Sequence, residues 1–125
     1  MLANLEKRTR SFANVKLQFG SVEDLPAESQ SFSCVVSVNT VYFWRDLKRG
    51  LQEIARVSRP RARLVLGFGS DTGMRAAGYE ERGFSLYSVE QISTCLESVG
   101  YSVQRVDRLE RPNGDFIGLL AQRED

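Results

Sequence analysis

A polar residue and a group of aromatic residues follow the most apolar stretch of the sequence. Cys34–Val38 is short, β-branched and without helical spacing, which is typical of a strand covered on both faces in an α/β sheet. Asn39 comes directly after it, and Tyr42, Phe43 and Trp44 follow. Open α/β folds place ligands in the crevice outside the carboxyl ends of their strands. The pattern therefore predicts a ligand site beside Asn39, with Tyr42 and Trp44 as its apolar wall.

Each of these side chains has an alternative role. Asn39 either faces a ligand or caps the local turn. Tyr42 and Trp44 either line a pocket or pack beneath the following helix or in a dimer contact, and we favour packing for Phe43. We expect Arg56 to be an ordinary surface charge near a helix end.

The composition excludes several kinds of catalytic chemistry. The sequence contains no histidine, which excludes His-based acid/base catalysis, Ser-His-Asp and Cys-His sites, and metals held by histidine. Cys34 and Cys95 are too few for a zinc site, so we predict no metal centre. We expect both thiols to be small core residues, with redox chemistry at Cys95 as the alternative.

Length and charge indicate one ordinary globular domain over residues 1–125. The net charge is +1 and the charges of both signs are interspersed, which argues against a nucleic-acid or membrane-surface protein. No apolar run approaches the length of a membrane span, and no signal-peptide pattern opens the sequence. We therefore expect a soluble protein of the cytoplasm.

The remaining elements must position the site. Helices and strands alternate and end in a hairpin, which predicts an α/β sheet with an antiparallel strand at one side. Before the central strand we expect a short helix over residues 1–10, a strand at Val15–Phe19 and a turn over 22–26. After it we expect a helix capped by Asp46 and stopped by Pro60, a strand over 63–68 and a mobile loop over 72–83 with one helical turn. The chain then continues with a helix capped by Ser88 and Gln91, and with strands over 102–109 and 116–122 joined by a turn at 112–115.

From Asn14 onward the sequence resembles the C-terminal two-thirds of a class I S-adenosylmethionine-dependent methyltransferase, of the type with a UbiE-like or type-11 domain. The resemblance runs through VKLQFGSVEDLP, SFSCVVSVNTVYFWRD, LQEIARVSRPRARLVLGF, YSVEQISTCLESVGY and FIGLLAQ. It implies a truncated Rossmann-like methyltransferase sheet, mostly parallel, with a C-terminal antiparallel hairpin. It also implies S-adenosylmethionine as cofactor, with Ser21, Val22 and Asn39 on the cofactor and Tyr42 and Trp44 on a small-molecule acceptor.

The sequence departs from the family pattern at the cofactor. The glycine-rich loop that follows the family's first strand, and the acidic residue after its second strand, have no counterpart in this sequence. Where the family has an acidic residue beside the adenine, this sequence has Ser21. The backbone of Val22 is then the group left to bind the adenine. The family's Pro-Gly-Gly turn appears as Pro60-Arg61-Ala62, where Arg61 replaces a glycine suited to positive φ.

The family's sheet order is 3-2-1-4-5-7-6, and the first two strands are not in this sequence. Cys34–Val38 then becomes an exposed apolar edge, which is a template for pairing with another chain. Either Val15–Phe19 moves in beside it, or two chains pair across it, with or without exchange of the N-terminal helix and strand. We expect a homodimer through the Cys34–Val38 edge or by N-terminal exchange.

Two functions follow from the resemblance. The first is methyl transfer from S-adenosylmethionine to a small acceptor, which needs positioning of two reactants more than acid/base groups. The second is a non-catalytic, dimerising methyltransferase-like module that binds another ligand or a protein partner.

Overall fold

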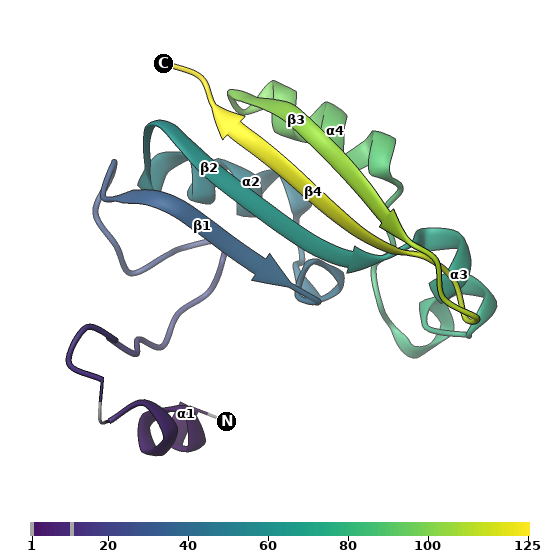
Figure 1. The fold of residues 1–125 in the computed structure, drawn as a ribbon, viewed down its shortest axis with the longest axis horizontal. Coiled ribbons are helices and arrows are strands. Elements are labelled where there is room, and N and C mark those ends of the chain that lie inside the picture. The colour runs from purple at the N-terminus through teal and green to yellow at the C-terminus, as the bar shows by residue number, and fades with distance from the viewer. Residues whose placement is uncertain (1, 11) are drawn as a thin grey trace.

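The computed structural model describes residues 2–10 and 12–125, and Figure 1 shows their arrangement. The strands are β1 (Phe32–Val38), β2 (Ser58–Gly69), β3 (Tyr101–Leu109) and β4 (Phe116–Arg123). The α-helices are α1 (Leu2–Thr9), α2 (Leu47–Val57), α3 (Asp71–Ala76) and α4 (Val89–Ser98). Two short 3-10 helices are η1 (Val41–Phe43) and η2 (Glu80–Arg82).

The strands form one mixed sheet in the order β1-β2-β4-β3. β1 pairs with β2 in parallel, with Val36 opposite Val65, whereas β4 pairs antiparallel with both β2 and β3. Three strands therefore run in one direction, as expected for a mostly parallel sheet, but only one of the neighbouring pairs is parallel. The C-terminal hairpin is confirmed. The order equals the 4-5-7-6 part of the expected family order.

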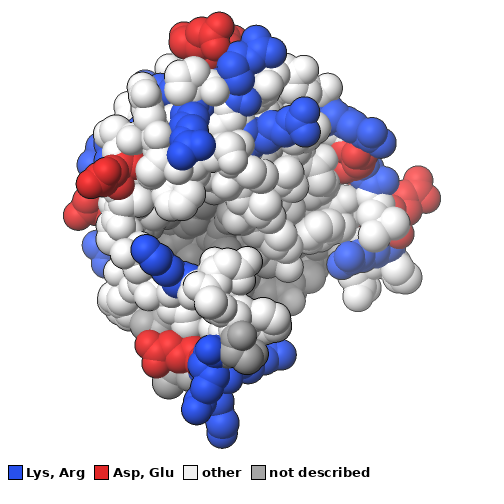
Figure 2. All heavy atoms as spheres, turned by 60° about the vertical axis from the view of Figure 1, so that its left-hand side comes forward, with Lys and Arg blue, Asp and Glu red and all other residues white. Residues whose placement is uncertain are grey.

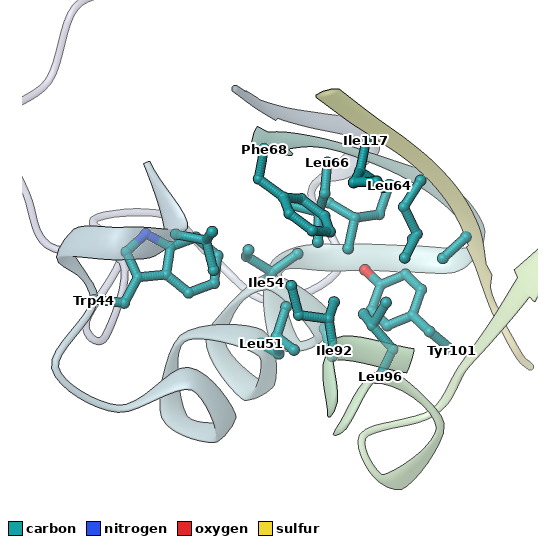
Figure 3. Packing of buried hydrophobic residues seen from close by; sticks show 14 of the residues in the cluster. Trp44, Leu51, Ile54, Leu64, Leu66, Phe68, Ile92, Leu96, Tyr101 and Ile117 are labelled. Atoms are coloured by element: carbon teal, nitrogen blue, oxygen red, sulfur yellow. The ribbon is translucent and has the colours of Figure 1, made fainter. Parts of the chain in front are cut away.

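The core lies between the sheet and helices α2 and α4, which pack on the same face (Figures 1 and 3). Alternate residues of β2 and β4 point into it, so that Leu64, Leu66 and Ile117 are buried. The apolar stripes of the two helices meet them, and Leu51 and Ile92 are fully buried. The spacing of apolar residues in the sequence predicts these contacts.

Both helices begin where the sequence indicates. The Asp46 carboxylate accepts a hydrogen bond from the Arg49 backbone at 3.1 Å. At α4, Ser88 and Gln91 form the expected reciprocal capping box. Helix α2 ends at Val57, before Pro60 as expected, but β2 begins directly at Ser58 and is therefore longer than the strand expected over 63–68.

The first strand lies at the edge of the sheet and is covered on one face only. Val35 and Ser37 point toward the core side, while Val36 and Val38 are 62% and 51% exposed. Cys34 is exposed as well, so the expectation that it is a small core residue is wrong. The apolar run of β1 suggests cover on both faces, but the sheet's second face is bare at this strand. The exposed edge itself is confirmed.

The expected strand at Val15–Phe19 is absent. Residues 14–20 are irregular, and the Phe19 side chain is 88% exposed. A strand needs a neighbour for its backbone hydrogen bonds, and the family's second strand, which would be that neighbour, is not in this sequence. The segment does not move in beside β1, so that alternative is wrong. Helix α1 lies apart from the sheet, at the end of this extended arm (Figure 1).

The segment after β2 is more regular than expected. Helix α3 begins at Asp71, where the Ser70 hydroxyl accepts a hydrogen bond from Gly73 N at 3.2 Å. The sequence predicts a mobile loop with one turn, because glycine and charged residues dominate it.

Cys95 is half-buried, and burial raises the pKa of its thiol.

Candidate functional site

A cleft of about 590 Å³ opens where the ends of β1 and β2 meet helix α3 and the turn between β3 and β4. We call it the aromatic cleft. This is the position at which the sequence predicts a ligand site. The residues that line it are Asn39, Tyr42, Phe43, Gly69, Ser70, Gly73, Met74, Tyr79, Phe84, Arg111, Pro112, Asn113, Gly114, Asp115 and Phe116.

Tyr42 ties together the ends of the two strands. Its hydroxyl accepts a hydrogen bond from the Gly69 backbone and donates one to Asn39 Oδ1 at 3.1 Å. Asn39 adopts a left-handed φ of 57°, a conformation that asparagine tolerates better than most residues. The Asn39 amide oxygen is thus occupied, and its Nδ2 group is the part left to meet a ligand. Burial raises the pKa of Tyr42, which keeps its hydroxyl a neutral donor.

Four aromatic rings form one wall of the aromatic cleft. Phe84 stacks on Tyr42 with ring centroids 5.7 Å apart and lies 4.9 Å from both Phe43 and Tyr79. Tyr42 is buried, whereas Phe43 is 65% exposed. The packing beneath a helix that we favour for Phe43 is therefore not what the structure shows. An exposed ring beside half-buried ones provides apolar surface for a ligand.

Charged side chains lie at the turn between β3 and β4. The Arg111 guanidinium stands over the Phe116 ring, 4.8 Å from its centroid. Asp115 pairs with Arg108 at 3.7 Å, and this pair lies on the same hairpin. Among the described residues, no carboxylate lies within 4.0 Å of the Arg111 guanidinium.

A second hollow of about 540 Å³ lies on the other side of Phe43 and is lined by Ser21, Val22, Glu23, Thr40, Phe43, Trp44 and Arg45. We call it the Trp44 hollow. The Ser21 hydroxyl accepts from Glu23 N at 3.2 Å, and Glu23 in turn accepts from Arg45 N at 3.1 Å. Trp44 itself is only 7% exposed, because its ring packs against Gly50 of α2.

The structure divides the predicted site residues between these two places. Asn39 and Tyr42 lie in the aromatic cleft, whereas Ser21, Val22 and Trp44 lie at the Trp44 hollow. Their roles with cofactor and acceptor remain predictions. Sequence reasoning missed Phe84, Tyr79 and Arg111 of the aromatic cleft. They come from segments distant in the sequence, and the loop predicted over 72–83 and the turn signal at 112–115 indicate only their neighbourhood.

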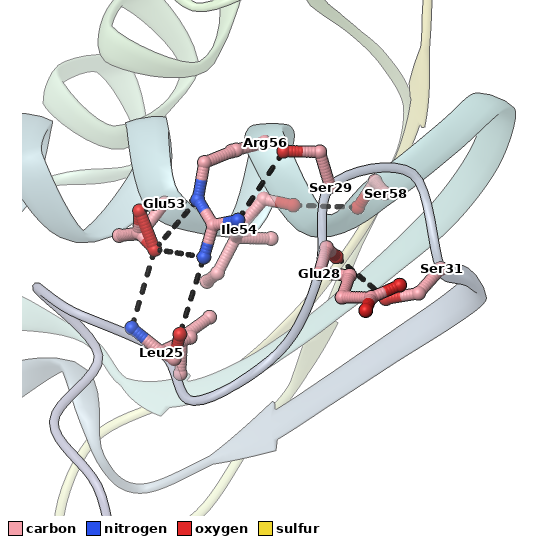
Figure 4. Close-up of polar contacts among 8 residues, drawn as sticks. All are labelled: Leu25, Glu28, Ser29, Ser31, Glu53, Ile54, Arg56 and Ser58. Carbon is pink, nitrogen blue, oxygen red and sulfur yellow. Dashed lines mark hydrogen bonds and ion pairs between the residues drawn. The ribbon is translucent and has the colours of Figure 1, made fainter.

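An ion pair holds the segment that carries Ser21 and Val22 (Figure 4). Glu53, which is 4% exposed, pairs with Arg56 at 2.6 Å and accepts a hydrogen bond from Leu25 N at 3.2 Å. Arg56 also donates to the Leu25 carbonyl and to Ser29. The hydrogen bond from Arg56 lowers the pKa of Glu53. Arg56 is thus a structural clamp and not the ordinary surface charge we expected.

The described residues fit part of S-adenosylmethionine but not all of it. The Trp44 hollow offers an aromatic face and backbone groups at Ser21 and Val22, which suit a flat heterocycle. Gly20 is the first glycine in the sequence, so the family's glycine-rich loop has no counterpart in it, and neither has the acidic residue that follows the family's second strand. We therefore derive no chemical step through the cofactor from these residues alone.

The surface charges, the helices and the possible metal ligands give three further findings. Figure 2 shows basic and acidic side chains intermixed on the face where β1 comes forward, around a hollow with largely uncharged walls. Among the helices that the structure describes, none combines the length and apolar character needed to cross a bilayer. Within residues 2–10 and 12–125, no cluster of cysteine and acidic side chains has the form of a metal site.

Comparison with known proteins reveals relatives of this chain. A family model described as a methyltransferase domain matches residues 1–66. The uncharacterized methyltransferase YodH of Bacillus subtilis is 43% identical over 65 residues, which are 49% of this chain and 28% of YodH. Across three such relatives, the chain spans 28 to 51% of their length.

Solved structures share the fold at low sequence identity. An S-adenosylmethionine-dependent methyltransferase from Thermotoga maritima superposes with a TM-score of 0.78 and 19% identity, covering 97% of this chain and 70% of that one. The [4+2]-cyclase SpnF superposes with a TM-score of 0.79 and 14% identity, covering 98% and 60%. Because the family model matches more than half of its residues, the chain, which corresponds to part of such a domain, belongs to the class I S-adenosylmethionine-dependent methyltransferase family.

Proposed function

We propose that this chain forms the acceptor-binding part of an S-adenosylmethionine-dependent methyltransferase that acts on a small molecule. The observation that carries the proposal is the aromatic cleft at the carboxyl ends of β1 and β2, in a chain of this family. Its volume of about 590 Å³ suits a small organic ligand.

The absence of histidine from the sequence is compatible with this chemistry. S-adenosylmethionine supplies an electrophilic methyl group, and catalysis of its transfer consists mainly of holding two reactants in line. The residues of this chain would hold and orient the acceptor. Phe43 and Phe84 provide ring faces, and Tyr42 keeps Asn39 in place by its hydrogen bond.

Calorimetric titration with S-adenosylhomocysteine tests the proposal. We expect saturable binding, with a dissociation constant between the micromolar and millimolar ranges because only part of a cofactor site is present. Val22→Pro removes the backbone N–H that the resemblance places on the adenine and should weaken binding, whereas Val22→Ala keeps that group and should not. Circular dichroism verifies that both variants fold. No heat of binding at millimolar ligand contradicts the proposal.

A second candidate is a non-catalytic module that dimerises through β1. The observation in its favour is the exposed edge, where Val36 and Val38 face solvent and no charged residue interrupts the strand. SpnF, described as a cyclase, illustrates that this fold serves more than one function. Light scattering at micromolar concentration should give the mass of two chains, and a monomer would remove this candidate.

A further inference from the structure

The aromatic cleft combines an apolar wall with the Arg111 guanidinium, which has no carboxylate partner among the described residues. Phe43 contributes an exposed ring to the wall, and Phe84 lies edge-on to it at 4.9 Å. Covering exposed apolar surface is favourable in proportion to its area. Flat aromatic ligands pack well on such rings, in offset or edge-to-face geometry.

The charge in the aromatic cleft favours an anionic ligand. Two charged residues line it, Arg111 and Asp115. Asp115 already pairs with Arg108 at 3.7 Å, whereas Arg111 has no carboxylate within 4.0 Å among the residues that the structure describes. A cationic ligand would meet Arg111 and compete with Arg108, while an anionic one would complete the set of charges.

Arg111 is also oriented before any ligand arrives. Its guanidinium lies over the Phe116 ring, with 4.8 Å between its central carbon and the ring centroid. Such a contact restricts the side chain while leaving the N–H groups of the guanidinium to bind an anion. A carboxylate matches this planar set of donors by forming two parallel hydrogen bonds.

Asn39 provides a further donor in the same cleft. Gly69 donates its N–H to the Tyr42 hydroxyl, so the hydroxyl proton is directed to Asn39 Oδ1. The Asn39 Nδ2 group then faces no acceptor among the described residues. Rings, a stacked guanidinium and an amide donor therefore line one cavity of about 590 Å³.

We propose that the aromatic cleft binds a flat aromatic carboxylate, with its rings against Phe43 and Phe84 and its carboxylate on Arg111. Only the claim that this ligand is the methyl acceptor rests on the proposed function. Binding itself requires no cofactor and is measurable on the chain alone.

Three probes separate ring recognition from charge recognition in calorimetric titrations: 2-naphthoate, 2-naphthamide and 2-naphthylmethylamine. We expect 2-naphthoate to bind at least about tenfold more tightly than the neutral amide, and the cationic amine to bind most weakly. Equal affinity for the acid and the amide, or no binding of the acid at millimolar concentration, would overturn the proposal.

Variants assign the binding to these residues. Arg111→Gln should lower the affinity for 2-naphthoate about tenfold and remove the difference between acid and amide. Arg105→Gln is the matched control, because it removes a guanidinium from the same hairpin. The Arg105 guanidinium pairs with Asp107 and lies outside the cleft. Phe84→Leu should weaken the binding of 2-naphthoate and of 2-naphthamide to the same extent. An unchanged preference for the acid in Arg111→Gln contradicts the assignment.

The two proposals fail in distinguishable ways. Binding of 2-naphthoate without binding of S-adenosylhomocysteine keeps the carboxylate site and removes methyl transfer. Binding of S-adenosylhomocysteine without 2-naphthoate keeps the proposed function and removes the carboxylate site.

Discussion

Among single residues, Tyr42 has the most direct role at the site, because its hydroxyl joins the ends of β1 and β2. It accepts from Gly69 N–H and donates to Asn39, so a single oxygen satisfies a backbone group and holds a cleft residue. The ring packs against Phe84 at the same time. A variant that removes the hydroxyl oxygen and keeps the ring therefore separates the structural role of Tyr42 from its role in forming the cleft.

Tyr42→Phe should lower the free energy of unfolding by about 1–3 kcal/mol, because the Gly69 N–H loses its partner. Urea denaturation measures the change, and amide hydrogen exchange should show faster exchange at Gly69. Tyr79→Phe is the control within the same ring cluster, since no hydrogen bond of the Tyr79 hydroxyl is found among the described residues. Equal losses in both variants would refute the role of the hydroxyl.

Arg61 is a second residue whose backbone geometry matters. Its φ is 69°, in the left-handed region where the family pattern has glycine. Arg61→Gly should raise the free energy of unfolding by up to about 1 kcal/mol, because the left-handed conformation costs a side-chain-bearing residue about 1–2 kcal/mol while glycine loses more backbone entropy. Thermal denaturation measures the gain. Arg59→Gly, at a position of the same strand without positive φ, should be destabilising instead.

The Glu53–Arg56 pair acts at the scale of elements, because it attaches the segment over 21–30 to helix α2. Glu53 accepts from Leu25 N, Arg56 donates to the Leu25 carbonyl, and Gln30 N donates to the Arg56 carbonyl at 2.9 Å. The segment has little regular structure of its own, so these bonds to α2 fix its place. The position of the Trp44 hollow depends on this clamp.

Glu53→Gln should cost about 1–3 kcal/mol of unfolding free energy, because Arg56 loses its ionised acceptor. The pKa of Glu53 is lowered from its ordinary value of 4.5, so its contribution is complete above that pH and is lost as the pH falls through the folded-state pKa. The variant should therefore lose less stability than the parent on acidification below pH 4.5. Glu28→Gln, at an exposed position, should keep the parental pH dependence in urea titrations at each pH.

At the scale of the whole molecule, the chain exposes more surface than its size requires. Its accessible surface is 8349 Å² for 14.1 kDa, whereas a compact monomer of this mass exposes about 6,700 Å². The difference of roughly 1,600 Å² is about twice the surface of about 800 Å² that one partner buries in a standard protein–protein interface. Phe19, Val36 and Val38 contribute to it. The extended arm and helix α1 contribute to this excess, and a partner on the edge and open face of β1 would cover part of it.

Val36→Lys tests the β1 edge as that contact. Val36 is 62% exposed, so the fold should tolerate the change, while a charge on an edge strand blocks pairing between sheets. We expect a dimer in the parent and a monomer in Val36→Lys by light scattering. Val36→Thr keeps the branched shape without charge and should remain dimeric. A parent that is monomeric, or a lysine variant that stays dimeric, contradicts the contact.

The sequence predicts much of the fold because its signals are local. The caps at Asp46 and Ser88, the apolar stripe of α4 and the turn at 112–115 depend on residues a few positions apart. The expectation failed where the outcome depends on whether another segment pairs with a strand or covers its face. Val15–Phe19 has the alternation of a strand but no neighbouring strand, and Cys34 has the apolar context of a buried residue on a face that nothing covers.

The site shows the same division. The family, the edge position of β1 and the place of Asn39 and Tyr42 at a strand end all follow from the amino-acid order, because periodicity and motif order are local properties of the chain. The burial of Trp44 beside α2, and the meeting of Arg111 and Phe84 in one cleft, are visible only in the folded chain. These residues are far apart in sequence, and the packing of separate elements brings them together.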